Sequence, residues 1–119
     1  MSTTELNKSH YLRYLYLLTN SEVDLKALAK YLTLYKTDEV AIFEILNYVY
    51  NKSGSHHQLV LFYLCFEVIK LTDGLILKDR MKEFISNNYL NSKTQANDAK
   101  VLKRFNDFEK ILRQKEIVK

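Results

Sequence analysis

The chain has 119 residues, the length of one domain, and 47% of them are hydrophobic, which is enough to build a core. With two glycines and no proline it lacks the turn residues of a β-rich fold, and its single cysteine excludes an internal disulfide framework and a zinc site of several cysteines. The net charge of +4 permits an acidic or phosphorylated partner but is too mild to indicate nucleic-acid binding. Residues 1–6 lack the basic and then apolar segments of a signal peptide, so we expect an intracellular protein.

Hydrophobic spacing predicts an all-α, single-domain fold in which short connections join the helices. The predicted helices span about residues 5–18, 22–35, 38–51, 55–71, 76–89 and 97–117. Asn20 or Ser21 is expected to cap the second helix and Thr37 the third, and Val40 is expected to be buried. Residues 87–94 are polar, so the sequence predicts a loop there.

The segment Ser55–Leu71 is apolar on nearly all sides, which is typical of a helix buried in the centre of a domain. A buried strand is the alternative, because short apolar runs do not distinguish the two. The length of the segment and the absence of an interrupting glycine or proline favour the helix. Ser55 and Gln58 have the spacing of a capping box, and both ends are too polar for a membrane span.

The sequence offers little for catalysis or metal binding. His56 and His57 are adjacent, so on a helix they point about 100° apart, and we expect solvated side chains rather than shared metal ligands. Cys65 lies in the most apolar segment and is expected to be a buried, structural thiol. No catalytic motif or glycine-rich phosphate loop occurs. We therefore expect no enzymatic activity, no metal and no cofactor.

Basic side chains of the last helix share one face through their three- and four-residue spacing: Lys100, Lys103 and Arg104. Such a face could hold a phosphate group. The alternative is a solvated face whose charges pair internally, for instance Glu109 with Arg113.

The central helix carries one acidic residue in its interior, Glu67, with Lys70 one turn later. The two either mark a groove where this helix reaches the surface or form its one solvated edge. Tyr31 and Tyr35 are four residues apart on the second helix, and packing with the hydroxyl groups at the surface is their simplest interpretation.

Four segments, in this order along the chain, resemble the CTD-interacting domain, also called the RPR domain: Leu28–Leu32, Asp38–Val40, Leu61–Lys70 and Ile111–Val118. The resemblance covers nearly the whole chain. The best match is Leu61–Lys70, which is similar to the central helix of the family. The resemblance implies a right-handed superhelix of about six to eight short helices, an architecture shared with ENTH and VHS domains.

Members of this family bind the phosphorylated heptad repeats in the C-terminal tail of the largest RNA polymerase II subunit, and they act in elongation, 3′-end processing and termination. The resemblance therefore implies a nuclear, non-catalytic module that binds such a phosphopeptide, with no membrane or direct nucleic-acid partner. The peptide-binding residues that it implies are Asn20, Ser21, Tyr63, Phe66, Glu67, Lys70, Lys103 and Arg104.

The chain departs from the family at two positions. Phe66 stands where the family usually carries an aspartate or asparagine that bonds the peptide backbone, and Leu71 stands near a frequent asparagine. The phosphate-reading arginine corresponds to Arg104, whereas an alignment shifted by three residues places Asp107 there. The family also includes unconventional members of CTD kinase complexes, so the alternative is a scaffold subunit that binds no peptide. A membrane role of the ENTH or VHS type would call for a basic or amphipathic N-terminus.

Overall fold

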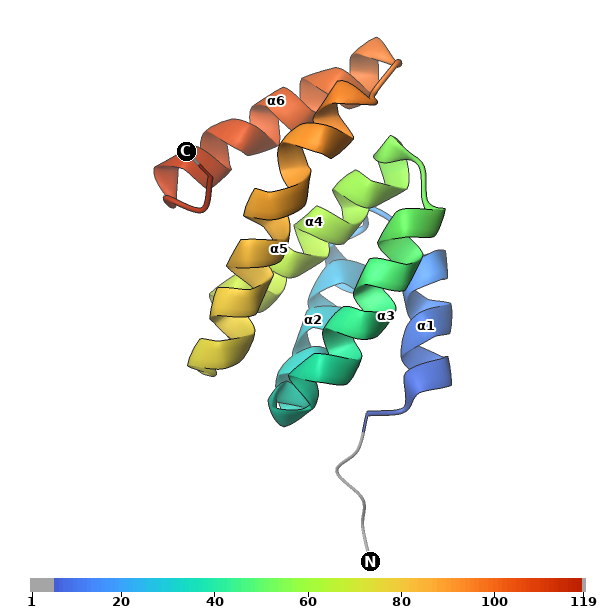
Figure 1. Cartoon of the computed structure of the whole chain (residues 1–119), viewed down its shortest axis with the longest axis vertical. Coiled ribbons are helices and arrows are strands. Elements are labelled where there is room, and N and C mark those ends of the chain that lie inside the picture. The colour runs from blue at the N-terminus through green and yellow to red at the C-terminus, as the bar shows by residue number, and fades with distance from the viewer. Residues whose placement is uncertain (1–5, 119) are drawn as a thin grey trace, which may run out of the picture.

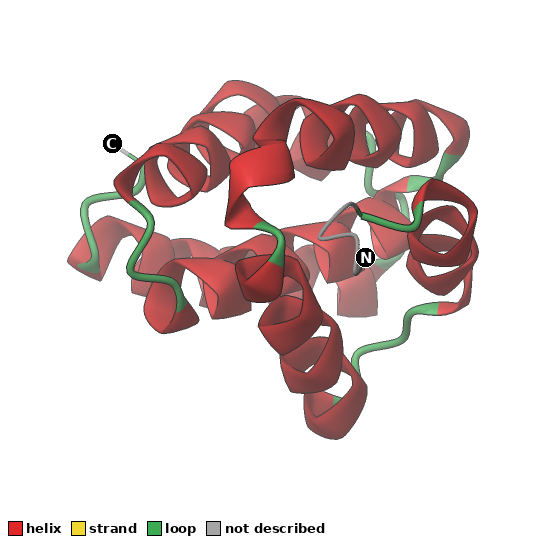
Figure 2. Cartoon of the chain, turned by 90° about the horizontal axis from the view of Figure 1, so that it is seen from below, coloured by secondary structure: helices red, strands yellow, loops and turns green. Residues whose placement is uncertain are grey.

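The computed structural model describes residues 6–118, which are helical except for short connections (Figure 2). The helices are α1 (Lys8–Leu17), α2 (Glu22–Leu34), α3 (Glu39–Lys52), α4 (Ser55–Leu71), α5 (Leu75–Thr94) and α6 (Ala99–Gln114), and a 3₁₀ turn, Lys36–Asp38, joins α2 to α3. No strand occurs in this part of the chain. The predicted all-α fold is therefore confirmed.

The helices pack in layers around α4. α1 packs against α3, α2 packs against α4, and α4 also packs along α5. α6 crosses one end of α5 and reaches α4 there (Figure 1). Because α2, α5 and α6 all contact α4, the residues on different sides of α4 face different neighbours.

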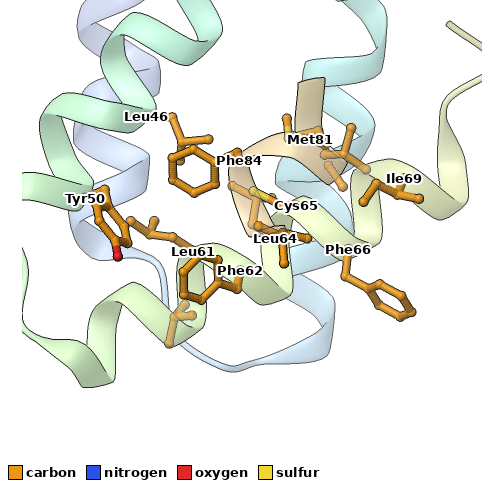
Figure 3. Close-up of a cluster of buried hydrophobic side chains, with 14 of the residues drawn as sticks. Leu46, Tyr50, Leu61, Phe62, Leu64, Cys65, Phe66, Ile69, Met81 and Phe84 are labelled. Carbon is orange, nitrogen blue, oxygen red and sulfur yellow. The ribbon is translucent and has the colours of Figure 1, made fainter. Parts of the chain in front are cut away.

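The central helix begins and ends where the sequence predicts, at Ser55 and Leu71. Ten of its residues are buried, including Phe62 and Cys65. Figure 3 shows Phe62, Cys65 and their neighbours on α4 beside Leu46 of α3 and Phe84 of α5. Burial raises the pKa of the Cys65 thiol, as expected for a structural cysteine.

The predicted capping box at the start of α4 is wrong. The cap is Gly54, with no side-chain hydrogen bond. Gln58 is instead buried, and its Nε2 donates hydrogen bonds to the carbonyl oxygens of Tyr50 (3.0 Å) and Ser53 (3.1 Å). Its Oε1, the atom that would accept from the cap N–H in a capping box, instead accepts a hydrogen bond from Ser92 Oγ at 2.6 Å.

The start of α3 also differs from the prediction. Thr37 does not cap this helix, because residues 36–38 form the 3₁₀ turn and Asp38 precedes the first helical residue. The Asp38 carboxylate accepts a hydrogen bond from the backbone N–H of Leu6 at 2.8 Å. Val40 is 65% exposed, because Ile42 and Phe43 supply the buried face of this turn.

The bounds of the other helices are corrected as follows. α1 begins at Lys8, where Asn7 caps it, and the predicted start at Glu5 lies outside the described residues. Ser21 caps α2 as predicted. Residues 87–94 are not a loop, because α5 continues to Thr94 and buries Tyr89 and Ser92 in the domain.

The last helix is shorter than predicted. α6 ends at Gln114 rather than Ile117, because Glu116 has a left-handed backbone with φ of 59°. Residues past this point turn back, and Ile117 is buried.

Candidate functional site

An aromatic contact joins α4 to α6. The ring of Phe108 lies edge to face against Tyr63 and against Phe66, with centroid separations of 4.8 and 5.5 Å. Phe66 is only 9% exposed, and in Figure 3 it extends from α4 away from the cluster around Phe84. Phe66 therefore anchors α6 to the central helix, and its ring is largely covered.

A row of charges runs beside this contact. Glu67 and Lys70 form an ion pair at 2.9 Å, and Lys70 Nζ lies 4.9 Å from the centroid of the Phe66 ring. On α2, Lys26 pairs with Glu22 at 2.7 Å. The hydrogen bond and charge of Glu22 raise the pKa of Lys26, and the charge of Glu67 raises it further. The charged side chains of α2 and α4 therefore act on one another across a shared face.

Arg104 of α6 lies four residues before Phe108, on the side of α6 that meets α4. Burial raises the pKa of the half-buried Tyr63, the charge of Arg104 lowers it, and the charge of Asp107 raises it. Arg104 itself is exposed. A cationic side chain and a tyrosine hydroxyl are therefore brought together where α6 meets α4, which is a chemically suitable combination for an anionic group.

Two other charged residues of α6 form an ion pair with each other. Lys103 Nζ pairs with Asp107 Oδ2 at 2.8 Å, and hydrogen bonding to this lysine lowers the pKa of Asp107. Asp107, which the shifted alignment placed at the phosphate position, is thus the partner of a neighbouring lysine. Lys103 would have to leave this pair to meet a ligand.

The structure does not bring all eight predicted residues together. Tyr63, Phe66, Glu67 and Lys70 lie on one side of α4, next to α6 and Arg104, and the charge of Glu67 acts on Lys26 of α2. This region is called the α2–α4–α6 face. Asn20 is exposed in the α1–α2 connection, and Ser21 Oγ accepts a 3.5 Å hydrogen bond from the N–H of Asp24. Within residues 6–118, no hydrogen bond or ion pair joins Asn20 or Ser21 to the predicted residues of α4 or α6.

The charges at the far end of α6 pair internally, as the alternative interpretation of the basic helix proposed. Arg113 donates two hydrogen bonds to Glu109 Oε2, at 3.0 and 2.8 Å. Lys93 of α5 approaches the other oxygen of this carboxylate at 2.9 Å. Hydrogen bonds from Lys93 and Arg113 lower the pKa of Glu109. Sequence spacing indicated the first pair, but it carried no signal for the second, which joins two helices.

The adjacent histidines have separate surroundings. His57 Nε2 lies 2.8 Å from the carbonyl oxygen of Leu15, whereas His56 is exposed. In the part of the chain that the structure describes, no three histidine, cysteine or carboxylate side chains gather as metal ligands would.

Two hollows lie elsewhere on the surface. One, of about 440 Å³, lies between α1 and α2, and the other, of about 610 Å³, lies between α5 and the C-terminal end of α6. None of the eight predicted residues lines either hollow. The first hollow was not predicted from the sequence, although Tyr14 and Leu17, which lie outside the buried stripe of α1, were a signal for it.

No protein-family model matches the chain, and neither the curated proteins nor the solved structures include a match. None of the helices within residues 6–118 is both long enough and apolar enough to cross a membrane.

Proposed function

We propose that this domain is a non-catalytic module of the CTD-interacting type, which binds an extended phosphorylated heptad peptide of RNA polymerase II in the nucleus. The observation that carries the proposal is the contact of α4 with α6, where Tyr63 and Phe66 pack on Phe108 beside the Glu67–Lys70 ion pair. The exposed Arg104 lies one helical turn before Phe108 and so borders this contact. A superhelical arrangement of the helices is part of this proposal. It is supported by the packing of α1 on α3 and of α2 on α4.

The chemistry of the face suits an anionic peptide that contains tyrosine. Arg104 is exposed, and its guanidinium can donate two hydrogen bonds to one phosphate. Tyr63 stands beside it and can pack against a ligand tyrosine. Phe66 is covered by Phe108 and offers no polar atom, so we assign backbone recognition to the Tyr63 hydroxyl and to Glu67, which would exchange its bond with Lys70 for one with a peptide N–H.

The first test is a titration of labelled two-heptad peptides, followed by fluorescence anisotropy at physiological salt. One peptide is unphosphorylated, and the others carry phosphate at the second or at the fifth residue of the heptad. We expect saturable binding that depends on phosphate. Equal affinity for all the peptides, or no binding at high protein concentration, would contradict the proposal.

Replacing Arg104 identifies the phosphate contact. Arg104→Ala should weaken binding of the phosphorylated peptide by about 1.5–3 kcal/mol, which is at least about tenfold in Kd, and leave the unphosphorylated peptide unaffected. Arg13→Ala is the matched control, because Arg13 is an exposed arginine on α1. An unchanged Kd for Arg104→Ala would remove Arg104 from the site.

A scaffold subunit is the second candidate, and exposed apolar side chains at one end of the molecule favour it. The contact of Lys36 with Asp73, at 2.7 Å, joins the α2–α3 and α4–α5 connections. Large apolar residues close to these connections are more than half exposed: Leu34, Val40, Leu71, Leu75 and Ile76. If all the peptides fail to bind while the protein is folded, this end becomes the surface to search for a protein partner.

A further inference from the structure

The hollow between α1 and α2 has a wall of aromatic rings. His10 lies edge to face with Tyr14 at a centroid distance of 4.6 Å and with Tyr31 at 6.4 Å. All three rings line the hollow, and Tyr14 is 48% exposed. The faces of tyrosine rings attract cations, most strongly where a methylene stem can also pack.

The charge of the residues that line the hollow also favours a cation. Among the described residues that line the hollow, Asp24 is the only aspartate, glutamate, lysine or arginine, although the whole chain has a net charge of +4. Within residues 6–118 no basic side chain pairs with the Asp24 carboxylate. The small, exposed residue Ala27 also lines the hollow and lies between Asp24 and Tyr31 along α2. The hollow therefore offers a negative charge, aromatic faces and room for an aliphatic stem.

Two cation-attracting points lie along the hollow. Asp24 and Tyr31 are both on α2, and their separation along the helix is about 10 Å at a rise of about 1.5 Å per residue. In an extended peptide the side chains on one face are two or four residues apart, about 7 or 13 Å, so two long basic side chains four residues apart can reach both points. Leu17, which also lines the hollow and is 68% exposed, can contact an apolar side chain that lies between two basic ones.

We propose that the α1–α2 hollow binds a basic peptide segment of another protein, with one cationic side chain on Asp24, a second over Tyr14 and Tyr31, and an apolar residue between them. This site is separate from the α2–α4–α6 face, and its ligand has the opposite charge. The domain would then hold an acidic and a basic partner at the same time.

The test uses a labelled eight-residue peptide with arginine at its third and seventh positions and leucine at its fifth, since these three side chains share one face of an extended peptide. A second peptide carries citrulline in place of both arginines, since citrulline keeps the shape of arginine but has no charge. We expect the arginine peptide to shift the backbone amide signals of α1 and α2 in an NMR titration, and to bind at least about tenfold more tightly than the citrulline peptide. Shifts confined to other helices, or equal binding of the two peptides, would overturn the proposal.

Variants with matched controls locate the site. Ala27→Lys places a positive charge in the hollow and should raise the Kd of the arginine peptide at least about tenfold. Ala99→Lys makes the same change on an exposed residue of α6 and should leave this Kd unchanged. Asp24→Asn should weaken binding of the arginine peptide and leave binding of the citrulline peptide unchanged. Asp79→Asn is its control. If a variant and its control lose equal affinity for the arginine peptide, the peptide responds to the overall charge of the protein. That result would contradict a binding site in the hollow. The phosphopeptide Kd of Ala27→Lys stays unchanged, so this site and the proposed function can fail separately.

Discussion

Gln58 joins three helices through its one buried amide. Its Nε2 binds carbonyl oxygens at the end of α3, and its Oε1 accepts a 2.6 Å hydrogen bond from Ser92 Oγ on α5. Tyr50 adds a bond of its own, from its hydroxyl to the carbonyl oxygen of Asn88 at 3.2 Å. Every polar atom of the Gln58 amide thus has a partner in the core, which fixes α3, α4 and α5 relative to one another.

Removing either side chain of this network leaves the other without its partner, so the costs of the two removals should overlap. Gln58→Leu leaves Ser92 Oγ and two backbone carbonyl groups without their bonds, and Ser92→Ala leaves Gln58 Oε1 without one, so we expect each to lower the free energy of unfolding by about 1–3 kcal/mol. The double variant should lose less free energy of unfolding than the two single variants together, because in the double variant neither side chain leaves the other unpaired.

Urea denaturation of the three variants measures these free energies. Ser86→Ala is the control, because Ser86 is an exposed serine on α5 whose hydroxyl donates a hydrogen bond to the carbonyl oxygen of Glu83, within its own helix. This control should change the free energy of unfolding by less than about 0.5 kcal/mol. If the losses of Gln58→Leu and Ser92→Ala add in the double variant, the two side chains are energetically independent and the network is not a unit.

At the scale of the helices, α4 was predictable and the end of α5 was not. A continuous apolar segment identifies a buried helix whatever its neighbours are, so Ser55–Leu71 was predicted correctly. Residues 87–94 are polar by themselves, and their helix depends on contacts from distant parts of the chain, such as the bond from Ser92 to Gln58 and the packing of Tyr89 on Phe62 at 5.2 Å. Local sequence contains no information about those partners.

The candidate site divides in the same way. Tyr63, Phe66, Glu67 and Lys70 lie three or four residues apart, so helix geometry predicts that they share a face. The ring of Phe108 that covers Phe66 comes from another helix, and no spacing in the sequence indicates it. The hollow between α1 and α2 likewise depends on how two helices meet.

The C-terminal end of α6 is a Schellman motif that uses a glutamate where glycine is usual. The N–H of Ile117 donates to the carbonyl oxygen of Leu112 at 2.9 Å, and the N–H of Glu116 donates to the carbonyl oxygen of Arg113 at 3.0 Å. Ile117 and Leu112 are both buried, which is the apolar contact that accompanies this motif. Glu116 has to take a left-handed backbone, which costs a residue with a Cβ about 1–2 kcal/mol.

Glu116→Gly should therefore raise the free energy of unfolding by up to about 1 kcal/mol, since the lower backbone strain is partly offset by the greater freedom of glycine in the unfolded chain. Glu83→Gly, at an exposed position inside α5, should lower it by about 1 kcal/mol. Urea denaturation of both variants gives the comparison. A loss of stability in Glu116→Gly would contradict a strained backbone at this position.

At the scale of the whole molecule, aromatic residues connect the layers. Tyr50 of α3 packs on Phe62 of α4 at 5.8 Å, Phe62 packs on Tyr89 of α5, and Tyr89 packs on Phe105 of α6 at 5.4 Å. Tyr11 of α1 is fully buried and donates a hydrogen bond from its hydroxyl to the carbonyl oxygen of Ile42 at 3.1 Å. The core therefore contains weak acids that must stay protonated for the helices to remain packed.

These acids make stability depend on alkaline pH. Burial raises the pKa of Cys65, of Tyr11 and of Tyr89, with the charge of Glu109 adding to the effect at Tyr89. In the unfolded chain a cysteine ionises near pH 8.5 and a tyrosine near pH 10. Above those values the unfolded state binds fewer protons than the folded state, so the free energy of unfolding falls as pH rises. Each such group contributes a slope of about 1.4 kcal/mol per pH unit once its unfolded form is ionised.

We therefore expect the free energy of unfolding to decline from about pH 8.5 and more steeply above about pH 10, as the cysteine and then the tyrosines of the unfolded chain ionise. Cys65→Ala leaves a cavity and should lower stability at neutral pH, but it should abolish the decline between about pH 8.5 and 10 and keep the steeper one. Urea denaturation from pH 7 to 11 measures both slopes. If the free energies of unfolding of the variant and the original chain decline in parallel between about pH 8.5 and 10, ionisation of the Cys65 thiol does not cause the decline.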